Sequence, residues 1–308
     1  MAEKSRVNGI FLALSLLAIL LLFTGCSSLQ GLGKKKGTNA EGEPFAGTVY
    51  TGTQGLVMQF AKDLPSTIFE GSPIDLIVEL RNLGTTSITS GKLYLGGYDK
   101  GIVPIMQETQ YVTVEGKSQY SQEGGFNTVD FRSQTITLPP GTDVYRPKFV
   151  LTACYEYETS ATPVVCIDPV PQLGTADKAC KPGAANVGSG QGAPVAVTSL
   201  YGEALPGKTR FKIEISNVGG GKVVNIRNCP YNLGYSDLNY VDYQISMSGA
   251  TGKDCKPISP LKLIDGKATL YCTFDVKGQT AYTTPLSIRL IYDYMSSIAK
   301  DVEIRSIG

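Results

Sequence analysis

Apolar and polar residues alternate with a period of two along two long segments of the chain. In residues 149–157 the apolar side chains fall on odd positions, and in residues 286–294 they fall on even positions. This period predicts β-strands with one face against a core. Shorter alternating or apolar runs predict further strands at 55–60, 74–80, 92–95, 110–114, 134–138, 195–201, 211–215, 222–226, 240–247 and 267–276.

Turn-forming residues separate these segments. The chain has 35 Gly and 17 Pro among 308 residues, and no stretch after residue 30 carries a long helical stripe. Short strands with frequent Gly and Pro favour sandwiches over a parallel α/β sheet. The sequence therefore predicts an all-β fold.

The two halves of the chain repeat each other. At an offset of about 136, residues 79–84 (ELRNLG) match residues 214–219 (EISNVG). At an offset of 137, Tyr-Glu-Tyr at 155–157 matches Tyr-Asp-Tyr at 292–294, and Tyr145 matches Tyr282. Such self-similarity predicts two copies of one domain. We place domain 1 at 48–170, a linker at 171–192 and domain 2 at 193–308. Each of the two domains is large enough to fold alone.

The N-terminus has the pattern of an export signal. Lys4 and Arg6 precede the mostly apolar run 10–23, which is shorter than a bilayer-spanning helix, and the run ends near Cys26. Residues 1–26 resemble a lipoprotein signal with Cys26 as the lipid attachment site. An uncleaved membrane helix and full release are the alternatives. Residues 27–47 then form a flexible tether, and the chain is expected at the extracytoplasmic face of the cell membrane, held by its N-terminus.

Both copies share one layout: a Gly, an alternating strand, an Asn-hydrophobic-Gly turn and a closing Tyr-x-Tyr strand. This layout resembles the CARDB-type, immunoglobulin-like modules of archaeal surface proteins. The junction 191–198 (QGAPVAVT) and the strand 153–157 (ACYEY) are also similar to membrane-anchored proteins of small-genome archaea. The resemblance implies two tandem immunoglobulin-like β-sandwiches that act as adhesive or spacer units, and it implies no catalytic residue.

Six cysteines follow the signal, an even number that predicts three disulfides in an exported protein. If residues 149–157 and 163–168 form a hairpin, Cys154 lies opposite Cys166, within reach of a disulfide. For the remaining cysteines we expect Cys180 with Cys229 and Cys255 with Cys272. A bridge between Cys229 and Cys272 is the alternative.

The composition excludes several kinds of chemistry. The chain has no His, so it lacks the usual general base of Ser and Cys hydrolases and the commonest metal ligand. With 28 basic and 27 acidic residues, it has no charge excess to attract nucleic acid. Asp237, Asn239 and Asp242 carry oxygen ligands, but their spacing fits no calcium loop. We therefore predict a non-enzymatic protein without a cofactor or a metal site.

One segment is a candidate for recognition. Tyr231, Tyr235, Tyr240 and Tyr243 lie close together with asparagines, a composition that binding loops use. We predict a surface protein that binds an extracellular protein or glycan. The first alternative is a structural subunit of a coat or filament that assembles through strand edges. The second is a hydrolase that uses paired carboxylates.

Overall fold

The computed structural model describes residues 49–173 and 178–307. The predicted signal segment, its lipid attachment site Cys26 and the tether lie outside the described residues. The described chain is almost entirely β, which confirms the predicted all-β class. Its short helical elements are two 3₁₀ turns, η1 (Ile226–Asn228) and η2 (Tyr235–Asp237).

Eighteen strands make up the described chain. The strands of the first half are β1 (Leu56–Phe60), β2 (Thr67–Phe69), β3 (Asp75–Asn82), β4 (Ile88–Gly96), β5 (Thr109–Val114), β6 (Phe126–Arg132), β7 (Val144–Tyr145), β8 (Lys148–Ala161) and β9 (Val164–Ile167). The strands of the second half are β10 (Val195–Leu205), β11 (Lys208–Asn217), β12 (Lys222–Val224), β13 (Tyr240–Met247), β14 (Ala250–Lys256), β15 (Leu261–Lys262), β16 (Lys267–Val276), β17 (Tyr282–Asp301) and β18 (Glu303–Arg305).

Most predicted strands are confirmed, and one is wrong. The strands predicted at 240–247 and 267–276 coincide with β13 and β16. Residues 134–138 form no strand, whereas β6 at 126–132 was not predicted. β6 lies at the edge of its sheet, where Phe126 is exposed and only Val129 and Phe131 are buried, so its apolar alternation is short.

Both halves contain two sheet layers with the same strand order. In the first half one layer is β1-β3-β6 and the other is β8-β4-β5. In the second half the layers are β10-β11-β16, with β14 added at the edge, and β17-β13-β15. The internal repeat read from the sequence is therefore present as a repeat of strand order.

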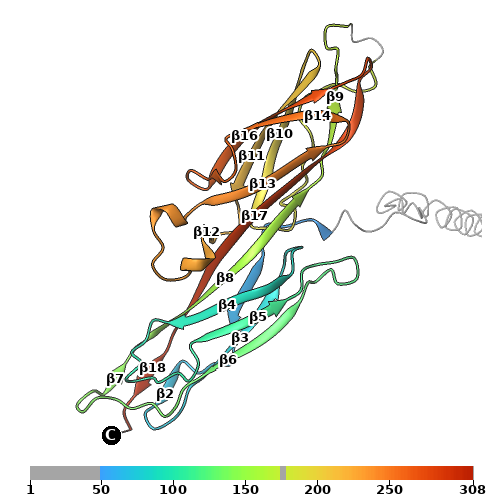
Figure 1. Cartoon of the computed structure of the whole chain (residues 1–308). Coiled ribbons are helices and arrows are strands. Elements are labelled where there is room, and N and C mark those ends of the chain that lie inside the picture. Colours follow the sequence, from blue (N-terminus) through green and yellow to red (C-terminus); the bar gives the residue numbers. More distant parts are fainter. Residues whose placement is uncertain (1–48, 174–177, 308) are drawn as a thin grey trace, which may run out of the picture. The chain divides into compact units, whose positions relative to one another are not determined.

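The two halves nevertheless share one sheet. β8 and β17 pair antiparallel through 14 register pairs, from Ala161 with Ile288 to Lys148 with Asp301. This pairing joins the second layers into one eight-stranded sheet, with β8 and β17 at its centre (Figure 1). The expectation of two structurally separate halves is therefore wrong, because the longest strand of each half has its partner in the other.

The last strand of each half crosses to the opposite half. β9 follows β8 but pairs with the start of β17, where Ile167 lies opposite Tyr282. β18 follows β17 but pairs with β7, where Ile304 lies opposite Tyr145. Both pairs are related by the repeat offset of 137. Because β8 continues to Ala161 without turning, the predicted hairpin of 149–157 with 163–168 does not form.

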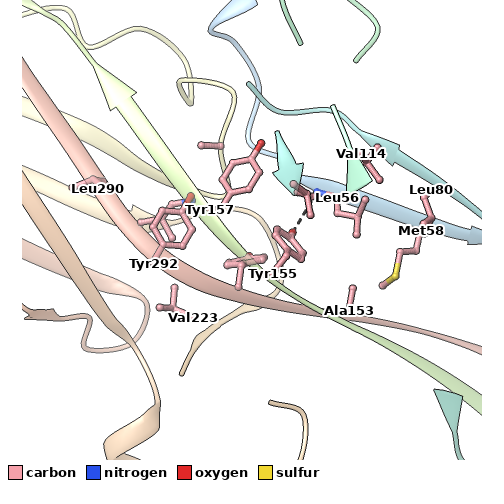
Figure 2. Close-up of a cluster of buried hydrophobic side chains, with 14 of the residues drawn as sticks. Leu56, Met58, Leu80, Val114, Ala153, Tyr155, Tyr157, Val223, Leu290 and Tyr292 are labelled. Carbon is pink, nitrogen blue, oxygen red and sulfur yellow. Dashed lines mark hydrogen bonds between the residues drawn. The ribbon is translucent and has the colours of Figure 1, made fainter. Parts of the chain in front are cut away.

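Four buried tyrosines meet near the middle of the β8–β17 pair. Tyr155 lies opposite Tyr294, and Tyr157 lies opposite Tyr292. Neighbouring ring centroids are 5.8–6.2 Å apart, so the four rings form a closed circuit. Figure 2 shows the three labelled rings within the surrounding apolar side chains. Burial raises the pKa of Tyr155, Tyr157 and Tyr292 above the usual tyrosine value, which keeps these phenols neutral.

The second tyrosine of each Tyr-x-Tyr strand, Tyr157 or Tyr294, explains the repeated Asn-hydrophobic-Gly motif. The Tyr157 hydroxyl donates to Asn82 Oδ1, as the Tyr294 hydroxyl donates to Asn217 Oδ1. A Cβ at Gly84 would lie 1.9 Å from the Tyr157 hydroxyl, so only glycine fits at this position. The motif therefore fixes each half's turn onto its central strand.

The first tyrosine of each Tyr-x-Tyr strand, Tyr155 or Tyr292, accepts a hydrogen bond from an equivalent backbone N–H group. The Leu56 N–H donates to the Tyr155 hydroxyl, drawn as a dashed line in Figure 2, and the Val195 N–H donates to the Tyr292 hydroxyl. Leu56 begins β1 and Val195 begins β10, the matching first strands of the two halves. The repeat thus extends to individual hydrogen bonds of the core.

The six cysteines form three disulfides, of which one matches the predicted pairing. Cys255 pairs with Cys272, its directly opposite residue on the neighbouring strand. The other two predicted pairs are wrong: Cys154 bonds Cys229, and Cys166 bonds Cys180. The cause is the crossing of β9, which carries Cys166 to β17 and leaves Cys154 on the outer face of the shared sheet.

The predicted linker 171–192 packs against the second half. Its Ala185 N–H donates to Leu200 O, and the Gly202 N–H donates to Gly183 O, so this segment lies along the free edge of β10. Gly190 forms a bridge with Thr51 at the start of the described chain. The described part of this segment is therefore an element of the fold.

Candidate functional site

The second half carries an insertion that the first half lacks. Asn82 and Asn217 are equivalent residues, and their residue numbers differ by 135. Lys92 and Asp242 are also equivalent, because they pair with equivalent positions of β8 and β17, but their residue numbers differ by 150. The difference of 15 residues is the length of the segment 225–239, which we call the flap. It interrupts the equivalent of β4, so that β12 and β13 pair with successive parts of β17 on either side of it.

The flap is fixed to the outer face of the shared sheet. The Cys154–Cys229 disulfide attaches it to β8, and both cysteines are buried in a small cluster with Val224. The ring of Tyr231 stands edge-on to Tyr94 of β4, with centroids 6.0 Å apart. A bridge over 75 residues restricts the unfolded chain strongly and holds this loop in place in the folded state.

A hollow of about 640 Å³ lies between the flap and the sheet. Its floor comes from β8 and β17, and its walls come from β12, β13, the flap and the residue that precedes β15 (Leu261–Lys262). Ile291, Val224 and Pro260 supply apolar surface, while Tyr240 supplies an aromatic wall. This volume is within the range of small-molecule and peptide side-chain pockets.

Carboxyl groups dominate the polar lining. Glu156 of β8 and Asp293 of β17 lie directly opposite each other on the sheet, and both point away from the tyrosine circuit. Asp242 of β13 and Asp237 of the flap complete the acidic lining, and Arg227 is the basic residue. Glu156 and Asp293 are also equivalent in the repeat, so the acidic position between two tyrosines occurs in both copies.

Asp293 has an altered titration. Burial raises the pKa of its carboxyl, and the neighbouring carboxylates of Glu156 and Asp242 raise that pKa further. A hydrogen bond from the Ile226 N–H, at 2.9 Å, and the charge of Arg227 oppose this increase. Asp293 therefore holds a proton more readily than an ordinary aspartate does.

Two of the four predicted binding tyrosines come together at the rim of the hollow. Lys262 Nζ lies 3.5 Å from the ring centroid of Tyr235 and 4.7 Å from that of Tyr240, a cation–π arrangement. Tyr231 instead covers Tyr94 outside the hollow. Tyr243 lies on the core side of β13, where its hydroxyl donates to Pro257 O at 2.6 Å.

The sequence reasoning missed the acidic floor of the hollow. Glu156 and Asp293 were used only to align the repeat, and the signal that they offered was an acid between two tyrosines in both copies. Asp237 and Asp242, considered as calcium ligands, do line the hollow. Across residues 49–173 and 178–307, no group of three or more acidic, Cys or His residues is arranged to hold a metal ion.

Comparisons with known proteins assign the chain to no family. No family model matches it, and no curated protein matches it. Among solved structures, the secreted serine protease VesC from Vibrio cholerae shares 11% identity over 80% of this chain, at a TM-score of 0.21. The chain spans about half (51%) of that protein, and a similarity at this TM-score establishes neither a shared fold nor a shared activity.

In the described part of the chain, no helix has the length and apolar character needed to cross a membrane.

Proposed function

We propose that the chain is a membrane-anchored, extracytoplasmic binding protein whose ligand occupies the hollow beneath the flap. The observation that carries this proposal is the insertion itself. The first half shows that the fold is complete without a flap, whereas the second half adds 15 residues and a disulfide that attaches them to the sheet. The result is a preformed concavity with walls from both halves, the usual setting of a ligand site.

Protection of strand edges favours binding over assembly into a coat or filament. Side-chain amides on the edge strands β5 and β6 donate hydrogen bonds to backbone carbonyls of these strands. Gln110 donates to Asp130 O, and Asn127 donates to Thr113 O. The edge strand β14 carries Lys253, Asp254 and Lys256, and charged edges resist pairing with another chain. We expect light scattering of the purified protein to find a monomer, whereas an ordered polymer would favour the structural alternative.

Blocking the hollow tests the site. Ile291 lines the hollow from β17, faces outward and is 37% exposed, so Ile291→Trp fills the hollow without disturbing the core. Ile77 of β3 is 38% exposed, faces outward in the other half and provides the matched control as Ile77→Trp. Residues 48–308 are applied to glycan arrays and whole cells to find the ligand. We expect Ile291→Trp to abolish that binding and Ile77→Trp to retain it; equal binding by both variants contradicts the proposed site.

The anchor is tested separately at Cys26. We expect the mature protein in the membrane fraction to begin at a lipid-modified Cys26, which mass spectrometry of the N-terminal peptide detects. Cys26→Ser then blocks processing or weakens membrane association. An intact Met1 or Ala2, with membrane association unchanged in Cys26→Ser, would instead identify a retained helix.

A further inference from the structure

We infer that the hollow recognises a basic peptide segment, whose ammonium or guanidinium group binds between the flap and the sheet. This inference rests on the proposed function and adds the chemistry of the ligand. Three features of the described residues carry it: the charge of the lining, an acid that the strands leave without a partner, and a cation already bound at the rim.

The lining charge is opposite in sign to that of the whole chain. Four carboxyl groups, from Glu156, Asp237, Asp242 and Asp293, face one guanidinium, from Arg227, which gives a formal charge of −3. The complete chain carries +1. A concave site with walls of low dielectric constant concentrates the field of such charges and attracts ligands of opposite sign.

The central acid pair is costly for the fold. Like charges directly opposite on neighbouring strands are destabilising, and Glu156 faces Asp293 in this way. One position further along the same face, β8 and β17 do the reverse: both oxygens of Glu158 accept hydrogen bonds from Arg289, at 2.8 and 2.5 Å. Glu156 makes neither a hydrogen bond nor a salt bridge within the ranges that the structure describes. The same strands therefore neutralise one acid and leave the adjacent one available to a ligand.

A cation of the chain itself already sits at the rim. Lys262 Nζ lies over the rings of Tyr235 and Tyr240 and donates to the Tyr240 hydroxyl at 3.3 Å. Tyr240 also lines the hollow, so this cation-binding aromatic pair is continuous with the carboxylates. The observation is independent of the acidic residues, and it shows that the rim accommodates an ammonium group on a methylene stem.

The apolar part of the lining fits that stem. Val224, Ile291 and Pro260 line the hollow beside the carboxyl groups. Lysine and arginine side chains pack their methylene stems on apolar surface while the charged head reaches polar groups. A basic side chain that enters the hollow can therefore use both kinds of wall at once.

Charge-matched peptides test the inference. Fluorescence anisotropy measures binding of labelled octalysine and octaglutamate to residues 48–308. We expect octalysine to bind, to weaken as salt is added, and to bind roughly 5–10-fold less tightly to Glu156→Gln and to Asp293→Asn, a loss of about 1 kcal/mol for one charged contact. Glu79→Gln removes an equal charge from exposed β3, away from the hollow, and is expected to change the affinity less than twofold. Removing one of two opposed acids relieves repulsion, so circular dichroism should show both hollow variants folded.

Several outcomes would overturn the inference. The inference fails if octalysine binds no more tightly than octaglutamate. It also fails if Glu79→Gln weakens octalysine binding as much as Glu156→Gln does. If octalysine fails to bind while Ile291→Trp abolishes binding to a neutral glycan or to cells, the proposed site stands and the cationic ligand is refuted. If Ile291→Trp changes no binding at all, both proposals fail.

Discussion

Separation of the two halves into independent fragments should abolish folding of each fragment alone. Residues 49–190 contain the first half with its Cys166–Cys180 disulfide, and residues 191–308 contain the second half with Cys255–Cys272. Each fragment loses the partner of its longest strand and the crossing strand that completes it. We expect both fragments to be unfolded or aggregated when expressed separately, and to assemble when they are expressed together.

The size of the effect follows from the shared strand pair. β8 and β17 contribute 14 cross-strand pairs, and at roughly 0.2–1 kcal/mol each these amount to about 3–14 kcal/mol. Domains of this kind are stable by only about 5–15 kcal/mol. Loss of the shared pairing therefore removes a free energy comparable to the entire stability of the protein.

The assay is circular dichroism and light scattering of each fragment, with Cys154→Ala and Cys229→Ala to remove the unmatched thiols. The uncut chain with the same two substitutions is the control, and it should remain folded. Two fragments that each unfold cooperatively as monomers would refute the reasoning, because the shared sheet would then be dispensable.

Three further predictions concern substitutions in the folded chain. Cys154→Ser with Cys229→Ser should lower the free energy of unfolding by about 4 kcal/mol in urea denaturation, the chain-entropy value for a bridge over 75 residues, and should weaken ligand binding because the flap is released. Gly84→Ala should cost about 3 kcal/mol because its Cβ would lie 1.9 Å from a buried tyrosine hydroxyl, whereas Gly96→Ala, with no atom within 4 Å, should be far milder by the same measurement. Asp293→Asn should stabilise the protein near pH 7, because it removes a carboxylate that burial and neighbouring acids disfavour. The gain should be less than about 1 kcal/mol, because the carboxyl is only partly buried. The raised pKa of Asp293 favours the protonated form in the folded state, so its stabilising contribution is present at low pH and declines as the pH rises above 3.8; thermal unfolding from pH 3 to 8 should show this decline in the wild type and not in Asp293→Asn.

Much of the fold was predictable because its strands are strongly periodic. The alternation in 149–157 and 286–294 identified the two central strands, and the aligned tyrosines identified the repeat. The pairing between halves was not predictable in this way. The two-residue period of a strand shows which of its faces is buried, but it does not show which other strand lies alongside. β9 could pair with β8 or with β17 on pattern alone, and the wrong choice also gave the wrong partner for Cys154 and Cys166.

The candidate site was partly visible in the sequence. The Tyr- and Asn-rich segment that the sequence offered for recognition overlaps the flap, and Tyr235 and Tyr240 do lie at the rim of the hollow. The acidic floor was not recognised, because Glu156 and Asp293 are 137 residues apart and meet only through the antiparallel register of β8 with β17. A site built by long-range pairing leaves no local motif.

The crossing of β9 and β18 gives the two halves the geometry of a strand-exchanged dimer. Two identical chains that exchanged their last strands in this way would form a dimer with a twofold axis between Glu156 and its copy, and every surface feature would then occur twice. Joining the copies in one chain removes that constraint. One copy keeps the uninterrupted strand β4, while the other accepts a 15-residue insertion at the equivalent place and lays it over one side of the axis. One insertion in one copy thus gives an otherwise symmetric arrangement of strands a single, asymmetric recess.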